Sequence, residues 1–184
     1  IEPEVVSPKS RLYKEHPEWF IQCKGRESMQ GRNTLMLDMG NPEVITYLQD
    51  SFSRTFQNID IDYFKWDMNR HVSQAGSLYL PANQQGEVVH RHILGVYRLL
   101  RWFRETYPNA MIETCSGGGG RYDLGMMKYG TMIWTSDNTG PKSRTRIQYS
   151  SMLAYPASTM SCHVTNHKAC EDEQELKYRY EIAL

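Results

Sequence analysis

The sequence has no excess of charge of either sign. Its 184 residues contain 21 Lys and Arg and 21 Asp and Glu, so the formal net charge at pH 7 is zero. Proteins that bind nucleic acid or anionic membranes through a long-range field carry a basic surplus, and this chain has none. We expect no nucleic acid and no membrane partner. Neutral, polyhydroxylated ligands remain compatible with this composition.

Long apolar runs and paired cysteine motifs are also missing. No stretch approaches the roughly 20 apolar residues that cross a bilayer, and no signal-peptide pattern is visible. The 4 cysteines, at positions 23, 115, 162 and 170, lack C-x-x-C spacing and are too sparse for a disulfide scaffold. No histidine has metal-ligand spacing with carboxylates. We therefore expect reduced thiols, a cytoplasmic location, and no metal or other cofactor.

What is present is an alternation of short apolar runs with longer amphipathic stretches, which is typical of strand–helix units around a parallel sheet. With 40% hydrophobic residues the chain can bury one sizeable core. Strands are expected at residues 34–38, 61–69, 110–115, 132–137 and 159–164, with a stub of another before Pro3. Because the sequence lacks an initial Met and ends inside a helical pattern, we expect residues 1–184 to be part of a longer polypeptide.

Helix signals separate these runs. Asn41 is an expected N-cap with Pro42 at the first helical position. The buried stripe of that helix is expected to be Val44, Leu48, Phe52 and Phe56. A second helix, about 86–106, is expected to bury Val89, Ile93, Val96, Leu100 and Phe103. Shorter helices are expected after Gly120 and Ser143, and a last one from about 172.

Polar residues follow several different strands: Asp38, Asp67 to Asn69, Cys115 to Gly118, and Asp137. Barrels build their active sites at the carboxyl ends of several strands, whereas open sheets gather ligands at one switch point. The predicted fold class is therefore α/β, a (β/α)8 TIM barrel. The chain supplies about five of its strands plus the stub, so 1–184 is expected to be an incomplete catalytic domain.

The densest polar cluster is in residues 63–70. Lys65, Asp67 and Asn69 share one strand face, while Phe64, Trp66 and Met68 share the other, which is expected to pack against the helical shell. A polar face of this kind needs a ligand or a polar network. A lone aspartate at a strand end is more often a cap or half of an ion pair, so ligand binding and a structural role both stay open here.

A second cluster covers residues 131–138, where Ile133, Thr135 and Asp137 share a face. Its Ser-Asp-Asn segment is also ordinary turn chemistry. Two strands apart on a curved sheet, Asp67 and Asp137 can approach to roughly 5 to 6 Å, the separation that suits a retaining glycosidase. Lys65 is expected to favour the charged, nucleophilic form of Asp67. Asp137, beside Trp134 and facing Asp67, is expected to favour the protonated form that a general acid needs.

A glycine run, Cys115-Ser116-Gly117-Gly118-Gly119-Gly120, suggests a phosphate loop but lacks the Gly-Lys-Ser/Thr ending. The alternative is a strand exit whose glycines allow close approach to a sugar. A Cys115 nucleophile needs an activating base, and the sequence identifies none. Arg32, in a glycine-containing loop, either reaches the cleft or is simply solvated.

Three segments together resemble the melibiase-type α-galactosidases of glycoside hydrolase family 36. They are Lys65-Trp66-Asp67-Met68-Asn69, Cys115-Ser116-Gly117-Gly118-Gly119 and Trp134-Thr135-Ser136-Asp137-Asn138-Thr139. The resemblance implies hydrolysis of terminal α-linked galactose from melibiose or raffinose-type oligosaccharides through a covalent galactosyl-enzyme. It implies Asp67 as nucleophile and Asp137 as acid/base. It implies substrate binding by Arg32, Lys65, Trp66, Met68, Asn69, Cys115, Ser116, Gly117 and Gly118.

The sequence departs from that family at Thr139-Gly140-Pro141, where relatives usually carry an acidic residue. The family's amino-terminal β-sandwich and carboxyl-terminal β-domain are expected to lie outside these residues. An α-N-acetylgalactosaminidase, a galactosyl-transferring relative and a catalytically inert fragment stay open as alternatives. A homo-oligomeric parent is compatible with the resemblance, which implies α-galactoside oligosaccharides as binding partners.

Overall fold

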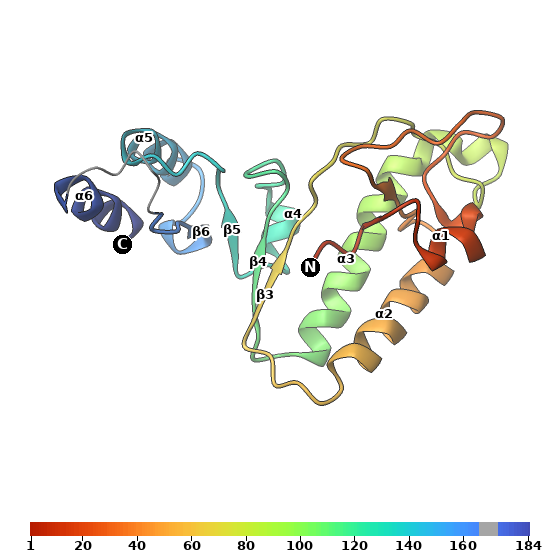
Figure 1. Ribbon diagram of the computed structural model, residues 1–184, viewed down its shortest axis with the longest axis horizontal. Coiled ribbons are helices and arrows are strands. Elements are labelled where there is room, and N and C mark those ends of the chain that lie inside the picture. The colour runs from red at the N-terminus through yellow and green to blue at the C-terminus, as the bar shows by residue number, and fades with distance from the viewer. Residues whose placement is uncertain (166–172) are drawn as a thin grey trace. The chain divides into compact units, whose positions relative to one another are not determined.

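The computed structural model describes residues 1–165 and 173–184, and these form two compact units (Figure 1). The first unit comprises 1–62 and 67–110, and the second comprises 63–66 and 111–184. Cys170, His167 and the expected helix start at Asp172 lie outside the described residues.

The first unit combines helices with a small antiparallel sheet. Its elements are β1 (Val5–Val6), α1 (Arg11–Glu15), η1 (Pro17–Trp19), β2 (Leu35–Met36), α2 (Pro42–Phe56), η2 (Ala82–Glu87) and α3 (Val88–Thr106). Strand β2 corresponds to the run expected at 34–38, but its partner is β1, and the pairing is antiparallel. The Leu37 N–H donates to Glu4 O at 2.9 Å, which extends this pairing beyond the strand.

Helix α2 begins where the capping signal predicts. The Asn41 side chain accepts a hydrogen bond from the Glu43 N–H at 3.0 Å, and Pro42 occupies the first turn, where no N–H is needed. Val44, Ile45 and Leu48 are its buried residues, while Phe52 and Phe56 are half-buried. The predicted apolar stripe is therefore correct in position.

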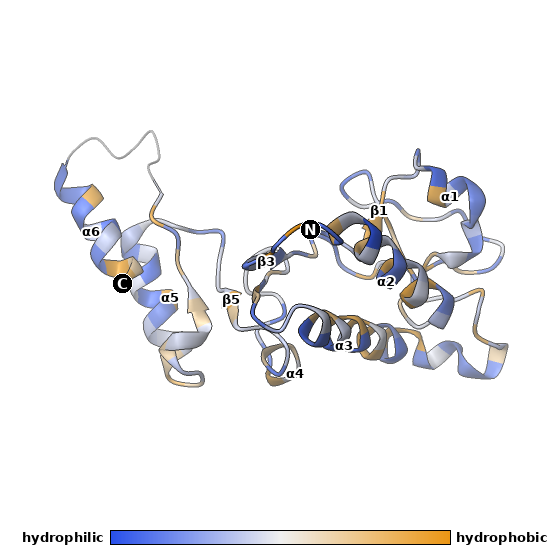
Figure 2. Cartoon of the chain, turned by 90° about the horizontal axis from the view of Figure 1, so that it is seen from below, coloured by the Kyte–Doolittle hydropathy of each residue, from blue (hydrophilic) through white to orange (hydrophobic). Residues whose placement is uncertain are grey.

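Helix α3 buries Val96, Leu100 and Phe103 as predicted, but its amino-terminal part buries other residues than the pattern indicates. Val88 is buried, whereas Val89, placed on the core face by the sequence pattern, is 44% exposed. The error has a physical reason: the buried face includes His92 and Gly95, which no apolar periodicity identifies. His92 Nε2 lies 3.2 Å from Glu4 Oε2, and both side chains are buried. Figure 2 shows hydrophilic and hydrophobic residues on different sides of this helix.

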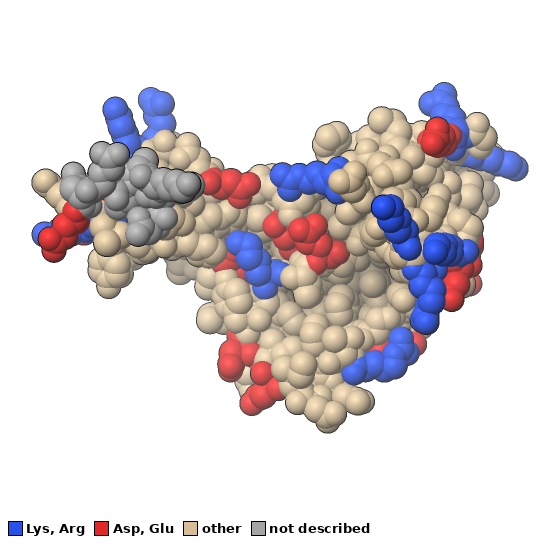
Figure 3. Space-filling view, in the orientation of Figure 1, with Lys and Arg blue, Asp and Glu red and all other residues tan. Residues whose placement is uncertain are grey.

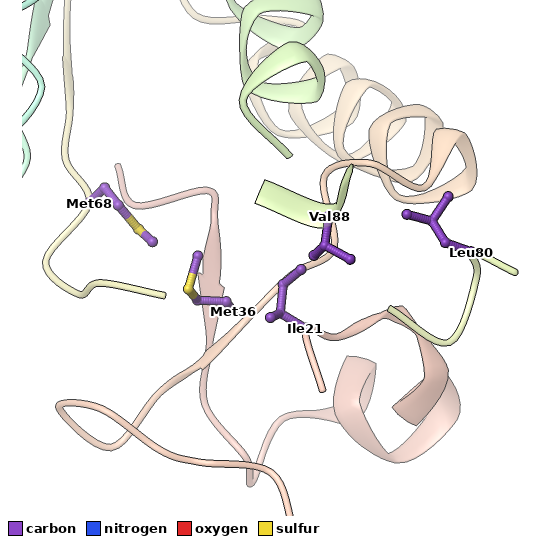
Figure 4. Close-up of a cluster of buried hydrophobic side chains, with 5 residues drawn as sticks. All are labelled: Ile21, Met36, Met68, Leu80 and Val88. Carbon is purple, nitrogen blue, oxygen red and sulfur yellow. The ribbon is translucent and has the colours of Figure 1, made fainter. Parts of the chain in front are cut away.

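A hydrophobic cluster in the first unit joins segments far apart in the sequence (Figure 4). It consists of Ile21, Met36, Met68, Leu80 and Val88. Met68 is 4% exposed, so its side chain belongs to the core.

The second unit is built on a parallel sheet of four strands in the order β3-β4-β5-β6. The strands are β3 (Tyr63–Trp66), β4 (Met111–Thr114), β5 (Met132–Trp134) and β6 (Met160–Ser161), and the helices are α4 (Leu124–Met127), α5 (Pro141–Met152), η3 (Ala157–Thr159) and α6 (Glu173–Ala183). Neighbours in the sheet are neighbours in the sequence, as in a (β/α)8 barrel. This confirms the predicted α/β class.

The acidic and basic residues that balance in the composition are both present on the surface. Figure 3 shows acidic and basic side chains interspersed on the visible face. Within 1–165 and 173–184, no helix combines the length and the apolar character that a membrane crossing requires.

Candidate active site

The predicted site residues follow the carboxyl ends of three parallel strands. Asp67 comes directly after β3, Cys115 directly after β4, and Asp137 three residues after the last residue of β5. Strand ends are where parallel α/β folds place reactive side chains, because backbone direction brings these ends to one edge of the sheet.

Within the second unit, the buried carboxylate of Glu113 is a hub for polar side chains. Lys65 and Glu113 are register partners on β3 and β4, and Lys65 Nζ lies 2.6 Å from Glu113 Oε1. The Tyr63 hydroxyl donates to Glu113 Oε2, and His163 Nε2 lies 3.5 Å from the same oxygen. The lysine that the sequence places beside Asp67 therefore has its ammonium anchored by a fully buried acid.

Competing effects act on the pKa of Glu113. Burial raises it, but hydrogen bonds from Lys65 and Tyr63 and the positive charge of Lys65 lower it, and the result lies below the ordinary value. The pKa of Tyr63 is raised by its own burial and by the same hydrogen bond. Glu113 is thus held charged, which keeps it matched to Lys65.

Trp134, at the end of β5, connects this hub to the predicted acid/base. Its ring lies under Lys65 Nζ, 4.6 Å from the centroid, and beside the His163 ring, 4.1 Å away. Its indole Nε1–H donates to Asp137 Oδ1 at 2.9 Å. Trp134 is buried and Asp137 is exposed, so a rigid donor holds a carboxylate that stays accessible.

The glycine-rich turn after β4 packs directly on the Asp137 loop. Gly118 has a φ of +88°, and a Cβ there would lie 3.2 Å from Asp137 N. A Cβ on Gly119 would lie 2.4 Å from Thr135 O, which is inside contact distance. The glycines therefore allow two motif segments to touch through their backbones. Of the other turn residues, Ser116 N donates to Gly118 O at 3.0 Å and Gly117 is exposed with a φ of +54°.

Cys115 is a structural part of this turn. It is 3% exposed, its N–H donates to Trp66 O at 2.7 Å, and its thiol lies 3.8 Å from Gly118 O. This burial argues against a cysteine nucleophile.

The first unit holds the segment that carries Asp67. The Asp67 N–H donates to Ile1 O at 2.9 Å, and its Oδ1 accepts from the Met68 N–H at 2.7 Å. The Asn69 amide donates to Glu2 Oε1 at 2.7 Å. Burial alternates along the segment as predicted: Trp66 and Met68 are buried, and Asp67 and Asn69 are half-buried.

Arg32 lies in a two-residue turn of unusual backbone conformation. Arg32 and Asn33 have φ values of 51° and 58°, and Gly31 and Thr34 exchange hydrogen bonds at 3.0 and 2.9 Å. Left-handed conformations at two non-glycine residues are costly and often mark functional positions. Arg70 supports the turn by donating to Thr34 O at 2.6 Å.

Asp38, also at a predicted strand end, is occupied inside the first unit. It is 1% exposed, accepts from the Ser77 hydroxyl, and accepts from the Gly40 N–H at 3.0 Å. These bonds give it a turn-forming role.

The structure thus assembles the predicted residues in two groups. The second unit brings Lys65, the Cys115–Gly118 turn and Asp137 together through Glu113 and Trp134. The first unit brings Asp67 and Asn69 onto one segment and links Arg32 to it through Arg70. Sequence reasoning missed Glu113, Arg70 and Arg144. The sequence signal that could have identified Glu113 is an acidic residue inside an apolar strand. The helix around Arg144 is polar and has no pattern that singles out this residue.

The melibiase family profile matches residues 1–184. The chain belongs to the melibiase family. It is 44% identical over 171 residues to the α-galactosidase AgaA of Geobacillus stearothermophilus, an alignment covering 91% of this chain and 24% of that protein. It is 46% identical over 165 residues to α-galactosidase 1 of Pediococcus pentosaceus, covering 90% and 22%.

Solved structures agree. AgaA in complex with raffinose superposes with a TM-score of 0.93 at 42% identity, covering 100% of this chain and 26% of AgaA. The Lactobacillus brevis α-galactosidase gives a TM-score of 0.92 at 41% identity, covering 100% and 25%. The resemblance to glycoside hydrolase family 36 and the partial-barrel fold are confirmed. The chain spans about a quarter of the length of these relatives.

Proposed function

We propose that the protein containing these residues is a retaining α-galactosidase that removes terminal α-linked galactose through a covalent galactosyl-enzyme. The observation that carries the proposal is the placement of two aspartates after β3 and β5 of one parallel sheet, separated by one strand. Retaining glycosidases need two carboxyl groups about 5 to 5.5 Å apart, one to attack the sugar and one to protonate the leaving group.

The relatives support the same pair. AgaA was crystallised with raffinose in a variant with one aspartate replaced by asparagine, and with stachyose in a variant with another aspartate replaced by alanine. Those two positions are separated by the same number of residues as Asp67 and Asp137. Both ligands are neutral oligosaccharides, in keeping with the zero net charge of this chain.

In this proposal Asp67 is the nucleophile and Asp137 the general acid and base. Lys65, Asn69, Arg32 and the turn of Cys115, Ser116, Gly117 and Gly118 bind the galactose hydroxyls. Trp66 and Met68, predicted to bind substrate, have buried side chains and flank Asp67 in the sequence, so in this proposal they support the segment that carries it. A cytoplasmic location belongs to this proposal and rests on the sparse spacing of the cysteines in the sequence.

The test is made on the full-length protein. Asp67→Asn is expected to lower kcat by roughly 10⁴-fold or more on every substrate, because no covalent intermediate forms. Azide then yields the β-galactosyl azide by direct displacement. Asp137→Asn is expected to lower kcat/KM for raffinose by roughly 10²- to 10⁴-fold and to spare kcat/KM for dinitrophenyl α-galactoside, whose leaving group needs no proton. Azide yields the α-galactosyl azide here.

Asp62→Asn is the matched control, because Asp62 is exposed and precedes β3, at the opposite end of the strand from Asp67. Its activity should equal that of the unmodified enzyme. Unchanged turnover in either Asp67→Asn or Asp137→Asn would remove that residue from the mechanism.

A further inference from the structure

A fully buried arginine on α5 donates hydrogen bonds to the loop that carries Asp137. Arg144 is 0% exposed. Resting on the proposed acid/base role of Asp137, we propose that Arg144 is a positioning residue for that carboxylate, acting through the loop Thr135–Asn138 and the ring of Trp134.

Among the described residues, the hydrogen bonds of the Arg144 guanidinium go to this loop and to the neighbouring strand. Nε donates to Asn138 O at 2.9 Å, and the two terminal nitrogens donate to Thr135 Oγ1 at 2.6 Å and Ser136 O at 2.5 Å. A further bond reaches Ser161 O of β6 at 3.3 Å. The acceptors lie on both sides of Asp137 in the sequence, so the guanidinium fixes the backbone before and after the reactive residue.

The same guanidinium also supports the side chain that holds Asp137. Its central carbon lies 4.4 Å from the centroid of the Trp134 ring, and Trp134 Nε1–H donates to Asp137 Oδ1 at 2.9 Å. Cation–π contacts of this kind strengthen when water is excluded. Arg144 therefore acts on Asp137 by two routes, through the loop backbone and through the indole.

Charge alone does not explain this placement. Burial lowers the pKa of Arg144, and the groups whose charges act on it are Cys162, Asp137 and Glu113. Its direct partners are carbonyl and hydroxyl oxygens of four residues. Only the forked, planar guanidinium supplies donors in these directions, and a lysine ammonium cannot reproduce them.

The experiment compares leaving groups in the full-length enzyme carrying Arg144→Lys. A displaced acid/base affects poor leaving groups more than good ones, so kcat/KM for raffinose is expected to fall roughly 30- to 100-fold. For dinitrophenyl α-galactoside, which needs no proton donor, the fall is expected to stay below about 3-fold. Arg146→Lys, an exposed neighbour on α5, is the control and should change neither value.

Trp134→Phe and Thr135→Val test the two routes separately and do not depend on whether Arg144→Lys folds. The first keeps a ring under the guanidinium but removes the Nε1–H that Asp137 accepts. The second removes the hydroxyl that Arg144 contacts at 2.6 Å. Both are expected to reproduce the raffinose-selective loss, and unfolding midpoints report whether each variant is folded.

The outcomes separate this inference from the proposed function. If Asp137→Asn shows the leaving-group split and the Arg144, Trp134 and Thr135 variants lose both substrates equally, the positioning role is overturned and the function stands. If Asp137→Asn itself shows no split, its acid/base role fails first.

Discussion

Glu113 shows at the scale of one residue how a buried charge is tolerated. Its carboxylate is fully buried but contacts the Lys65 ammonium and the Tyr63 hydroxyl, with His163 nearby. An unpaired carboxylate in such a place would cost several kcal/mol, and the paired one aligns β3 with β4. Glu113 thus holds β3 and β4 in register, and it fixes the position of the ammonium of Lys65, the proposed sugar-binding lysine.

Replacing Glu113 by Gln is expected to lower the free energy of unfolding by roughly 1 to 2 kcal/mol at pH 7, because Lys65, whose side chain is 35% exposed, loses its buried partner. The pKa of Glu113 is depressed in the folded state, so its stabilisation is present above the unfolded pKa, about 4.3, and is lost as pH falls through the folded pKa. Urea unfolding between pH 7 and pH 3 should show that the free energy of unfolding falls less steeply with acid in Glu113→Gln than in the unmodified protein.

Glu181→Gln is the control for that comparison. Its side chain is 57% exposed and lies 3.8 Å from Lys177, so its removal should change stability by less than about 1 kcal/mol. Equal effects of the two substitutions would contradict the hub role of Glu113.

At the scale of an element, the position of α3 depends on one glycine. Gly95 is buried, and a Cβ there would lie 1.8 Å from Met39 O. No side chain fits in that space, so the helix contacts the segment after β2 through bare backbone. Glycine normally weakens a helix by about 1 kcal/mol relative to alanine, and here the close packing outweighs that cost.

Gly95→Ala is therefore expected to destabilise the first unit by roughly 2 kcal/mol or more, against its gain in helix propensity. Denaturant unfolding followed by circular dichroism measures the change. Gly86→Ala, where a Cβ meets nothing within 4 Å, should stay within about 0.5 kcal/mol of the unmodified chain. A stabilised Gly95→Ala variant would refute the close packing.

At the scale of the whole molecule, the described sheet has β3 and β6 at its two ends. Parallel sheets are usually covered on both faces, and open strand edges promote association. The relatives are about four times as long as this chain, so it matches only a part of each of them.

A polypeptide of these 184 residues expressed by itself is thus expected to self-associate and to show no turnover of p-nitrophenyl α-galactoside, the substrate that we propose for the full-length protein. Light scattering after size exclusion and a release assay measure the two properties. Full turnover by a monomeric 184-residue chain would contradict the need for the rest of the barrel.

Local patterns predicted the elements well where one residue's chemistry decides the outcome. Asn41 caps α2 as expected, and burial alternates through Trp66, Asp67 and Met68. The helix-face prediction failed at Val89, which is exposed while Val88 and His92 are buried, and the His92 imidazole is paired with Glu4. Apolar periodicity cannot identify a buried polar pair formed between residues so far apart in the sequence.

The sequence by itself determined the family, the α/β class and the two aspartates proposed for catalysis, because motif residues and strand ends are local properties of the chain. Only the tertiary structure decided that Glu113 anchors Lys65, that Trp134 holds Asp137, and that Arg144 supports both the loop and the indole. Those roles depend on distances across neighbouring strands and from helix to loop. Such distances arise when the chain packs, and no spacing in the sequence encodes them directly.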